Sequence, residues 1–272
     1  MRPTTLTAYR WELRKLASQR RTYIGLGAAA LLPVLFVVVL SLQKGGPHDA
    51  PLAFNLRHTG VVLALVVLTF ASRFGAQLLT ALVAGDIVAT EDSGGTLKLI
   101  LTRSLKRSQI LAGKVLASFT YAGALLAALL LTAFVSGTIA WGFKPVTNIS
   151  FTQISATHAL ALTFPALGIF LVPLLGIAAF GIFLSTLTRN SAASIVGTLV
   201  YELLQEAIGG LVHVQWIKRH LLSTQFDAWH GFFQTPIGWG IVVRALWVSA
   251  IYIAIPLAAA FWIFLRRDVA GE

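Results

Sequence analysis

The chain has 272 residues, of which 57% are apolar and only 11% are charged, and its mean hydropathy is +0.80. A soluble domain usually carries about 25% charged residues, so this chain has too little polar surface for a water-exposed globule. Its net charge of +11 gathers beside apolar segments, which is typical of membrane topology and not of nucleic-acid binding. The absence of cysteine excludes disulfides and thiolate metal sites.

Six apolar runs are long enough to cross the roughly 30 Å hydrocarbon core of a bilayer as helices. We therefore predict an all-α, polytopic membrane protein that forms one transmembrane domain over residues 1–272. The first run begins at Tyr23 and is not followed by the small-residue cleavage site of a signal peptide. Only the polar break 185–191 separates the fourth run from the fifth, and the even count depends on it. The predicted spans are 23–42, 59–84, 115–141, 160–187, 192–212 and 240–265.

Lysine and arginine indicate the orientation, because they concentrate in cytoplasmic loops. With the N-terminus inside, fourteen of them fall on cytoplasmic segments and five fall outside. We therefore predict that both termini are cytoplasmic, which requires an even number of spans. Arg73 and Arg244 fall within predicted spans. The five outer residues are Lys44, Arg57, Lys144, Lys218 and Arg219.

Residues 4–21 precede the first span and show helical periodicity. Their apolar residues recur at spacings of three, four and three, which places them on one helical face, and charged residues fall elsewhere. This pattern predicts an amphipathic helix on the cytoplasmic leaflet, where cations meet anionic membrane lipid. The alternative is a charged flank that only sets topology. The apolar face is Leu6, Tyr9, Leu13 and Leu16, and the other residues are Arg10, Glu12, Arg14 and Lys15, with Trp11 at the inner interface.

The loop 85–114 is the longest cytoplasmic stretch between the predicted spans. Residues 93–95, Ser-Gly-Gly, end the helix that leaves the second span, and Thr96 can cap a short helix that follows. Leu97 and Leu101 lie on the apolar edge of that helix. A capped helix that projects into the cytoplasm is suited to docking a partner, and the alternative is an ordinary connecting loop.

The segment 213–239, between the fifth and sixth spans, is too aromatic for a free loop and too polar to cross the membrane. We predict an extracytoplasmic insertion of interfacial or re-entrant helices. Its aromatic residues are Trp216, Phe226, Trp229, Phe232, Phe233 and Trp239.

Within the loop 85–114, an acidic residue precedes Gly-Thr-Leu, a leucine-rich turn and a basic residue follow, and Gly-Lys opens the third span. This order resembles the loop after the second span in permeases of the ABC type-2 exporter family. Ser104 stands where that family often has proline. The surface helix, six spans and aromatic insertion also resemble the family's layout. The matching residues are Glu91, Gly95, Thr96, Leu97, Leu101, Arg107, Gly113 and Lys114.

The resemblance implies a non-catalytic permease subunit in a prokaryotic-type cell membrane, paired with a second permease chain that is expected to be a copy of this one. Two cytoplasmic ATPase subunits would bind ATP and Mg and dock on the loop and the surface helix. This chain lacks a GxxxxGK[ST] phosphate loop, so we expect a separate ATPase and no cofactor here. By position, the expected ATPase contacts are Glu91, Asp92, Thr96, Leu97 and Arg103 in the loop, with Arg10, Trp11 and Arg14 on the surface helix.

Three charged residues fall inside predicted spans: Arg73 in the second, and Glu202 and Glu206 on one face of the fifth. A charge at mid-bilayer costs at least about 2.5–3.5 kcal/mol, so such groups usually pair or face water. Arg73 and Glu202 lie at similar depths by helical rise, so they could pair. Two interpretations stay open, a polar translocation path and an internal ion pair that fixes packing.

The main alternative to an exporter subunit is an ion-coupled secondary transporter or a channel that uses Arg73, Glu202 and Glu206. An intramembrane enzyme is disfavoured because the spans contain no HExxH or GxSxG signature. The six histidines share no metal-ligand spacing, so we predict no metal site.

Overall fold

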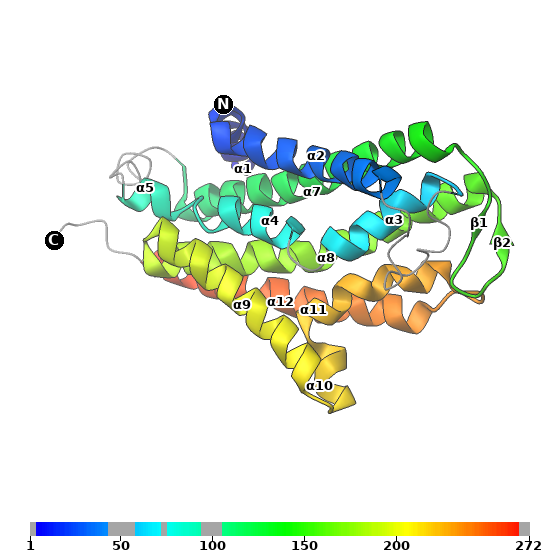
Figure 1. Ribbon diagram of the computed structural model, residues 1–272. Helices are drawn as coiled ribbons and strands as arrows, with labels where there is room; N and C mark the ends of the chain where they lie inside the picture. The colour runs from blue at the N-terminus through cyan, green and yellow to red at the C-terminus, as the bar shows by residue number, and fades with distance from the viewer. Residues whose placement is uncertain (1–3, 43–57, 72–74, 94–104, 267–272) are drawn as a thin grey trace.

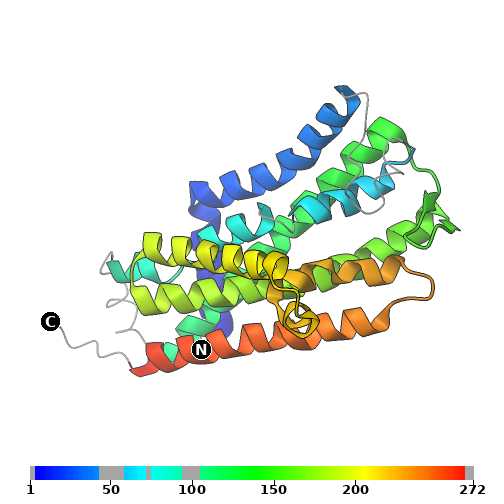
Figure 2. The same ribbon diagram turned by 60° about the horizontal axis from the view of Figure 1, so that its bottom comes forward.

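The computed structural model describes residues 4–42, 58–71, 75–93 and 105–266, and these ranges are almost entirely helical, as predicted. The long helices lie side by side in one elongated bundle, whereas α1 lies across them (Figures 1 and 2). The helices are α1 (Thr5–Ser18), α2 (Arg20–Leu42), α3 (Val61–Phe70), α4 (Ala76–Ala84), α5 (Ala89–Ser93), α7 (Arg107–Trp141), α8 (Ala156–Thr188), α9 (Ser191–Leu211), α10 (Gln215–His220), α11 (Leu222–Gln225), the 3₁₀ helix η3 (Phe226–Phe233) and α12 (Trp239–Arg266).

Four helices of the described ranges, α2, α7, α8 and α12, are long and apolar enough to cross a membrane. Each contains one of the predicted spans, so the chain is a helical membrane protein. The predicted span 59–84 contains the two helices α3 and α4. Residues 72–74 between them lie outside the described part. The predicted fifth span corresponds to α9, whose hydropathy is lowered by Glu202 and Glu206.

The polar break between the fourth and fifth runs is confirmed. Helix α8 ends at Thr188, and Arg189 then takes a left-handed backbone conformation with a φ of 56°. Asn190 caps α9, because its side-chain oxygen accepts a hydrogen bond from the N–H of Ala193 at 3.0 Å. The chain therefore reverses here, and α8 and α9 lie beside each other (Figure 2).

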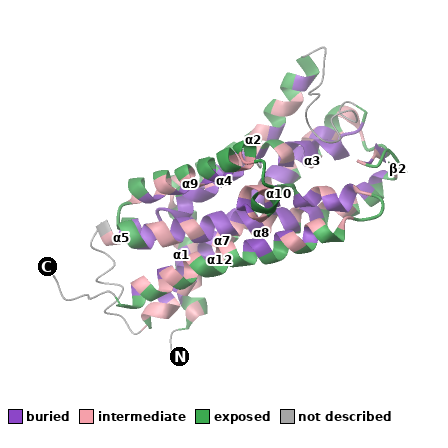
Figure 3. Ribbon diagram, turned by 90° about the horizontal axis from the view of Figure 1, so that it is seen from below, coloured by how far each residue is buried: buried purple, intermediate pink, exposed green. Residues whose placement is uncertain are grey.

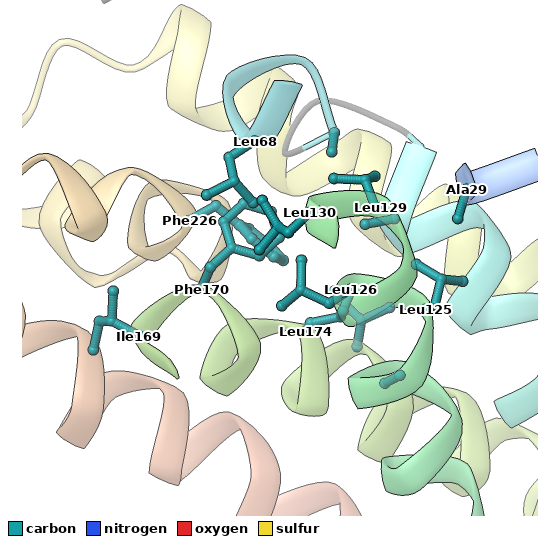
Figure 4. Close-up of a cluster of buried hydrophobic side chains, with 14 of the residues drawn as sticks. Ala29, Leu68, Leu125, Leu126, Leu129, Leu130, Ile169, Phe170, Leu174 and Phe226 are labelled. Atoms are coloured by element: carbon teal, nitrogen blue, oxygen red, sulfur yellow. The ribbon is translucent and has the colours of Figure 1, made fainter. Parts of the chain in front are cut away.

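The buried core is centred on α7 and α8, with the other helices around them (Figure 3). Leu126 and Leu130 of α7 face Phe170 and Leu174 of α8 in this core (Figure 4). The ring of Phe226 from η3 packs against Phe170 with a centroid distance of 5.1 Å. Helices α2, α9 and α12 instead expose many large apolar side chains, as expected where helices face lipid.

The segment 213–239 forms the short helices α10, α11 and η3, and η3 packs against α8 and α12. Trp216 and Trp239 are exposed there, as at a membrane interface, but Trp229 and Phe233 are buried in the core. The short strands β1 (Val146–Thr147) and β2 (Gln153–Ile154) pair antiparallel near this segment, and the sequence pattern did not predict them. The Ile149 N–H donates to the Phe233 carbonyl oxygen at 3.2 Å and joins the hairpin to η3.

Helix α7 approaches the start of α3 closely at Gly137, where an added Cβ would lie 2.6 Å from the carbonyl oxygen of Gly60. We expect Gly137→Ala to destabilise the protein by about 1–3 kcal/mol, because the two backbones would have to separate. The measurement is the thermal unfolding midpoint in detergent. Gly123→Ala on the same helix is the matched control, since a Cβ there meets nothing within 4 Å. Equal midpoints for the two variants would contradict the close approach.

Candidate functional site: a charge network at one end of the bundle

Helix α5, the start of α9 and the end of α12 lie at the same end of the bundle (Figure 1). Four cations and four carboxylates form ion pairs at this end, and they come from α1, α2, the turn after α4, α5, α7 and the residue that follows α8. We call this set the charge network. Its cations are Lys15, Arg21, Lys114 and Arg189, and its carboxylates are Glu12, Asp86, Glu91 and Asp92.

Lys114 of α7 is the centre of the network, and its side chain is fully buried. Its Nζ lies 2.9 Å from Oε1 of Glu12 and 2.6 Å from Oε2 of Glu91. It also donates a hydrogen bond to the carbonyl oxygen of Ile87 at 3.1 Å. Three acceptors match the three N–H donors of an ammonium group. The cost of burying this cation is therefore offset by two opposite charges and by hydrogen bonds to Glu12 and to the Ile87 carbonyl oxygen.

Glu91 of α5 is buried and pairs with Lys15 of α1 as well as with Lys114. Burial by itself would raise the pKa of the Glu91 carboxyl group. The ammonium groups of Lys114 and Lys15 outweigh burial and hold that pKa below its ordinary value. Glu91 is therefore ionised at neutral pH, and it connects α5 to both α1 and α7.

Asp86, in the turn after α4, is a second centre of the network. Its carboxylate pairs with Arg21 at the start of α2 and accepts hydrogen bonds from the hydroxyl groups of Thr90 and Ser191. Near the surface, Nε of Arg189 lies 3.6 Å from Oδ2 of Asp92. Asp86 therefore links α2, α5 and α9.

Two serines hold the backbone of the turn between α4 and α5. The Ser185 hydroxyl of α8 accepts hydrogen bonds from the N–H groups of Val88 and Ala89 at 3.2 and 2.9 Å. The Ser194 hydroxyl of α9 donates to the carbonyl oxygen of Gly85 at 2.6 Å. Because buried backbone groups need partners, these bonds fix the turn against both α8 and α9.

Gly113, next to Lys114, is where α1 packs on α7. A Cβ at Gly113 would lie 2.8 Å from the Cβ of Ala8 and 2.9 Å from the backbone nitrogen of Tyr9. Only a glycine allows this approach without displacement of α1. Gly113 therefore leaves room for α1 to pack closely against α7. Lys114, the next residue, forms an ion pair with Glu12 of α1.

The helix predicted over 4–21 is present as α1, but its faces differ from the prediction. Placing Glu12 away from the packed face is wrong, because Glu12 is buried between Ala8 and Leu16 against α7. Leu6, assigned to the apolar face, is 53% exposed. The residues predicted for the surface of this helix are exposed, namely Arg10, Trp11 and Arg14.

The structure places the predicted loop contacts unequally. Glu91 is inside the charge network, and Asp92 is partly exposed beside Arg189. The other predicted contacts, Thr96, Leu97 and Arg103, lie outside the described residues. The sequence pattern missed Glu12 and Asp86, although the spacing Ala8, Glu12, Leu16 marks one helical face.

A smaller polar contact joins α4 to α9 within the bundle. Glu202 is buried and hydrogen-bonds with Gln77, while its Oε2 and the Thr80 hydroxyl have no hydrogen-bond partner among the described residues. Glu206 is half-buried one turn further along α9. Arg73, the predicted partner of Glu202, lies outside the described residues. Within those residues no group of histidine, aspartate and glutamate could hold a metal ion.

The apolar helices and the charge network define a helical membrane protein. The profile of the DUF2705 family, whose members are described as proteins of unknown function, matches residues 49–270, and the chain belongs to this family. The match includes Asp86, Glu91 and Lys114, whereas Glu12 and Lys15 precede it.

The chain is also similar to the uncharacterized protein YhcI of Bacillus subtilis (strain 168). The two are 29% identical over 207 residues, which cover 71% of this chain and 64% of that relative. The chain therefore spans less than two thirds of the relative's length.

Replacement of the central cation tests the network. We expect Lys114→Met to destabilise the protein by about 3–5 kcal/mol, because Glu12 and Glu91 would keep buried charges without their partner. The measurement is the thermal midpoint in detergent, with the exposed Lys106→Met, directly before the same helix, as control. The triple variant Glu12→Gln, Glu91→Gln, Lys114→Met should recover part of the loss. A Lys114→Met midpoint equal to that of Lys106→Met would contradict this account of the network.

Proposed function

We propose that this chain is the permease subunit of an ABC exporter, with six spans and both termini in the cytoplasm. A separate ATPase would supply the energy for export of a substrate across the cell membrane. One observation carries the proposal: the charge network joins α1 to residues 85–93. Residues 85–93 begin the loop 85–114, which, together with the surface helix, the resemblance to ABC type-2 permeases assigns to ATPase docking.

The network would make these parts move together. Glu91 binds Lys15 of α1 and Lys114 of α7, so a force on the loop after α5 cannot displace α5 by itself. Breaking a buried ion pair by removal of one partner costs about 3–5 kcal/mol, so a joint movement is favoured over local deformation. Ser185 and Ser194 would then carry the displacement to α8 and α9.

Because Glu91 is buried, we propose a different role for it than direct contact with the ATPase. Its carboxylate faces the interior, so Glu91 would hold α1, α5 and α7 together and would not touch the ATPase. The exposed surface of α1 and the residues around Asp92 would contact the ATPase directly. The residues proposed for direct contact are Arg10, Trp11, Arg14, Asp92, Thr96, Leu97 and Arg103.

The proposed assembly has two copies of this chain and two ATPase subunits, which bind ATP and Mg. This chain has no GxxxxGK[ST] phosphate-binding loop, so the ATPase subunits would hydrolyse ATP. This chain would form the transport path and couple it to the ATPase. An apolar path with few buried charges suits an amphipathic substrate.

An ion-coupled transporter or channel is the second candidate. The observation in its favour is the buried carboxylate of Glu202 beside Gln77, with Glu206 one turn away. The same contact also serves an exporter, in which Arg73, Glu202 and Glu206 would line the path or fix the packing of α4 against α9. The candidates differ in their energy source.

The proposed topology can be tested directly because the chain contains no cysteine. We expect a membrane-impermeant maleimide to label Phe151→Cys in intact cells, since Phe151 is 80% exposed in the hairpin that is predicted to be outside. Lys106→Cys and Thr188→Cys, both at exposed positions, should react only after the cells are opened. Labelling of Thr188→Cys in intact cells would contradict the six-span topology.

Association with an ATPase tests the proposed function. We expect the ATPase encoded beside this chain to co-purify with it, and ATP hydrolysis to drive transport in vesicles. Leu97→Asp in the loop and the pair Arg10→Glu and Arg14→Glu on α1 should each greatly reduce co-purification. Phe151→Asp, an exposed apolar position at the other end of the bundle, should leave it unchanged.

Two outcomes would count against the exporter. One is full ATPase binding by both docking variants, which would remove α1 and the loop as docking elements. The other is transport that needs an ion gradient, proceeds without ATP and is abolished by Glu202→Gln, which would favour the second candidate.

A further inference from the structure

A cavity of about 470 Å³ lies between α8, α9, α10 and α12, apart from the charge network and from the polar contact of α4 with α9. Aromatic side chains from all four helices line it, and aliphatic side chains of α12 complete the wall. Its volume is within the range of about 300–1,000 Å³ that is typical of small-molecule sites. The aromatic lining residues are Phe180, Tyr201, His220, Trp247 and Tyr252.

The interior of this cavity is an apolar surface. The Tyr252 hydroxyl donates to the carbonyl oxygen of His220 at 3.2 Å, and Nε2 of Gln205 donates to the Tyr201 hydroxyl at 2.9 Å. The Tyr201 ring stacks on Phe180 with a centroid distance of 3.9 Å. Because both hydroxyls already have protein partners, the walls offer mainly ring faces and methyl groups, which suit a hydrocarbon chain.

The cavity opens sideways from the bundle. Trp247, Ile251 and Ile255 on its α12 rim are 45%, 45% and 66% exposed. In a membrane-spanning helix such side chains face lipid. A hydrocarbon chain could therefore enter from the bilayer without crossing water.

The last turn of α10, which brings His220 to the cavity, carries basic side chains. The His220 ring contacts the rings of Trp216 and Trp247, with centroid distances of 4.9 and 5.3 Å. Lys218 and Arg219 lie in the same last turn of α10, which projects from the bundle beside α9 (Figure 1). None of the lining residues is acidic. Tryptophans beside lysine and arginine are typical of the interface between hydrocarbon and headgroups.

We propose that this cavity binds an anionic phospholipid, with one acyl chain between the aromatic walls and the phosphate at Lys218 and Arg219. The rings by themselves could attract a cationic headgroup, but the two positive charges in the same turn as His220 favour an anion. The proposal rests on the membrane character of the chain and not on the exporter function.

Quenching of tryptophan fluorescence by lipids brominated in the acyl chains tests this site. The full chain is reconstituted in phosphatidylcholine vesicles that contain the same fraction of either brominated phosphatidylglycerol or brominated phosphatidylcholine. The emission of Trp247 is the difference between the wild type and Trp247→Phe. Phosphatidylglycerol should bind with a preference of roughly tenfold or more, since each lysine or arginine near the headgroup contributes a factor of about five.

Two variants separate the headgroup from the chain. Lys218→Gln with Arg219→Gln should remove the preference for phosphatidylglycerol, whereas Lys144→Gln, at another exposed basic position on the hairpin side, should retain it. Ile251→Phe, which fills the cavity from the exposed rim, should reduce the quenching of Trp247 by both lipids.

Equal quenching by the two lipids in the wild type, or a preference that survives the double glutamine variant, would overturn the anionic headgroup. Stronger quenching by phosphatidylcholine would assign the cavity to a zwitterionic lipid. Unchanged quenching in Ile251→Phe would show that the acyl chain lies outside the cavity. The substituted basic residues are not buried, so each of these outcomes can be measured on folded protein.

Discussion

The buried ammonium group of Lys114 constrains how the parts of this protein fit together. A charge in an apolar interior is tolerated only when opposite charges and hydrogen-bond acceptors surround it. Helix α7 supplies the cation, but both carboxylates come from elsewhere, Glu12 from α1 and Glu91 from α5. The charge of Lys114 is thus satisfied only when three segments, distant in sequence, are all in place, and it couples their positions.

Polar chemistry in this apolar chain is concentrated in three places with different physical character. In the charge network, each buried charge has an oppositely charged partner. The contact of Glu202 with Gln77 is a small polar contact between α4 and α9, inside the bundle. The cavity beside α10 is apolar inside, and the turn of α10 that reaches it carries Lys218 and Arg219. In the proposed exporter, the charge network would couple the ATPase to the bundle. The contact of Glu202 with Gln77 would line the transport path or fix the packing of α4 against α9, and the cavity would bind lipid.

The spans with uniform hydropathy were the most predictable part of the fold, because length and apolar content decide whether a helix can cross a bilayer. The start of α9 was also predictable, since Asn190 is a good cap after a polar break. The burial of Glu12 was not, because a carboxylate on an amphipathic helix is assigned to solvent unless its partner is known. Trp229 was assigned to an interface by composition, yet it is buried where η3 packs against α8 and α12.

The sequence by itself determined that this is a helical membrane protein, which parts of it are apolar enough to cross a bilayer, and that α1 has two unlike faces. These properties depend on composition and on spacing within single segments. Only the tertiary structure decided that Glu12, Glu91 and Lys114 meet, that Gly113 admits α1, and that α8, α9, α10 and α12 enclose a cavity. Each of these depends on how close segments far apart in the chain come to one another. The pattern of residues within one segment gives no information about that distance.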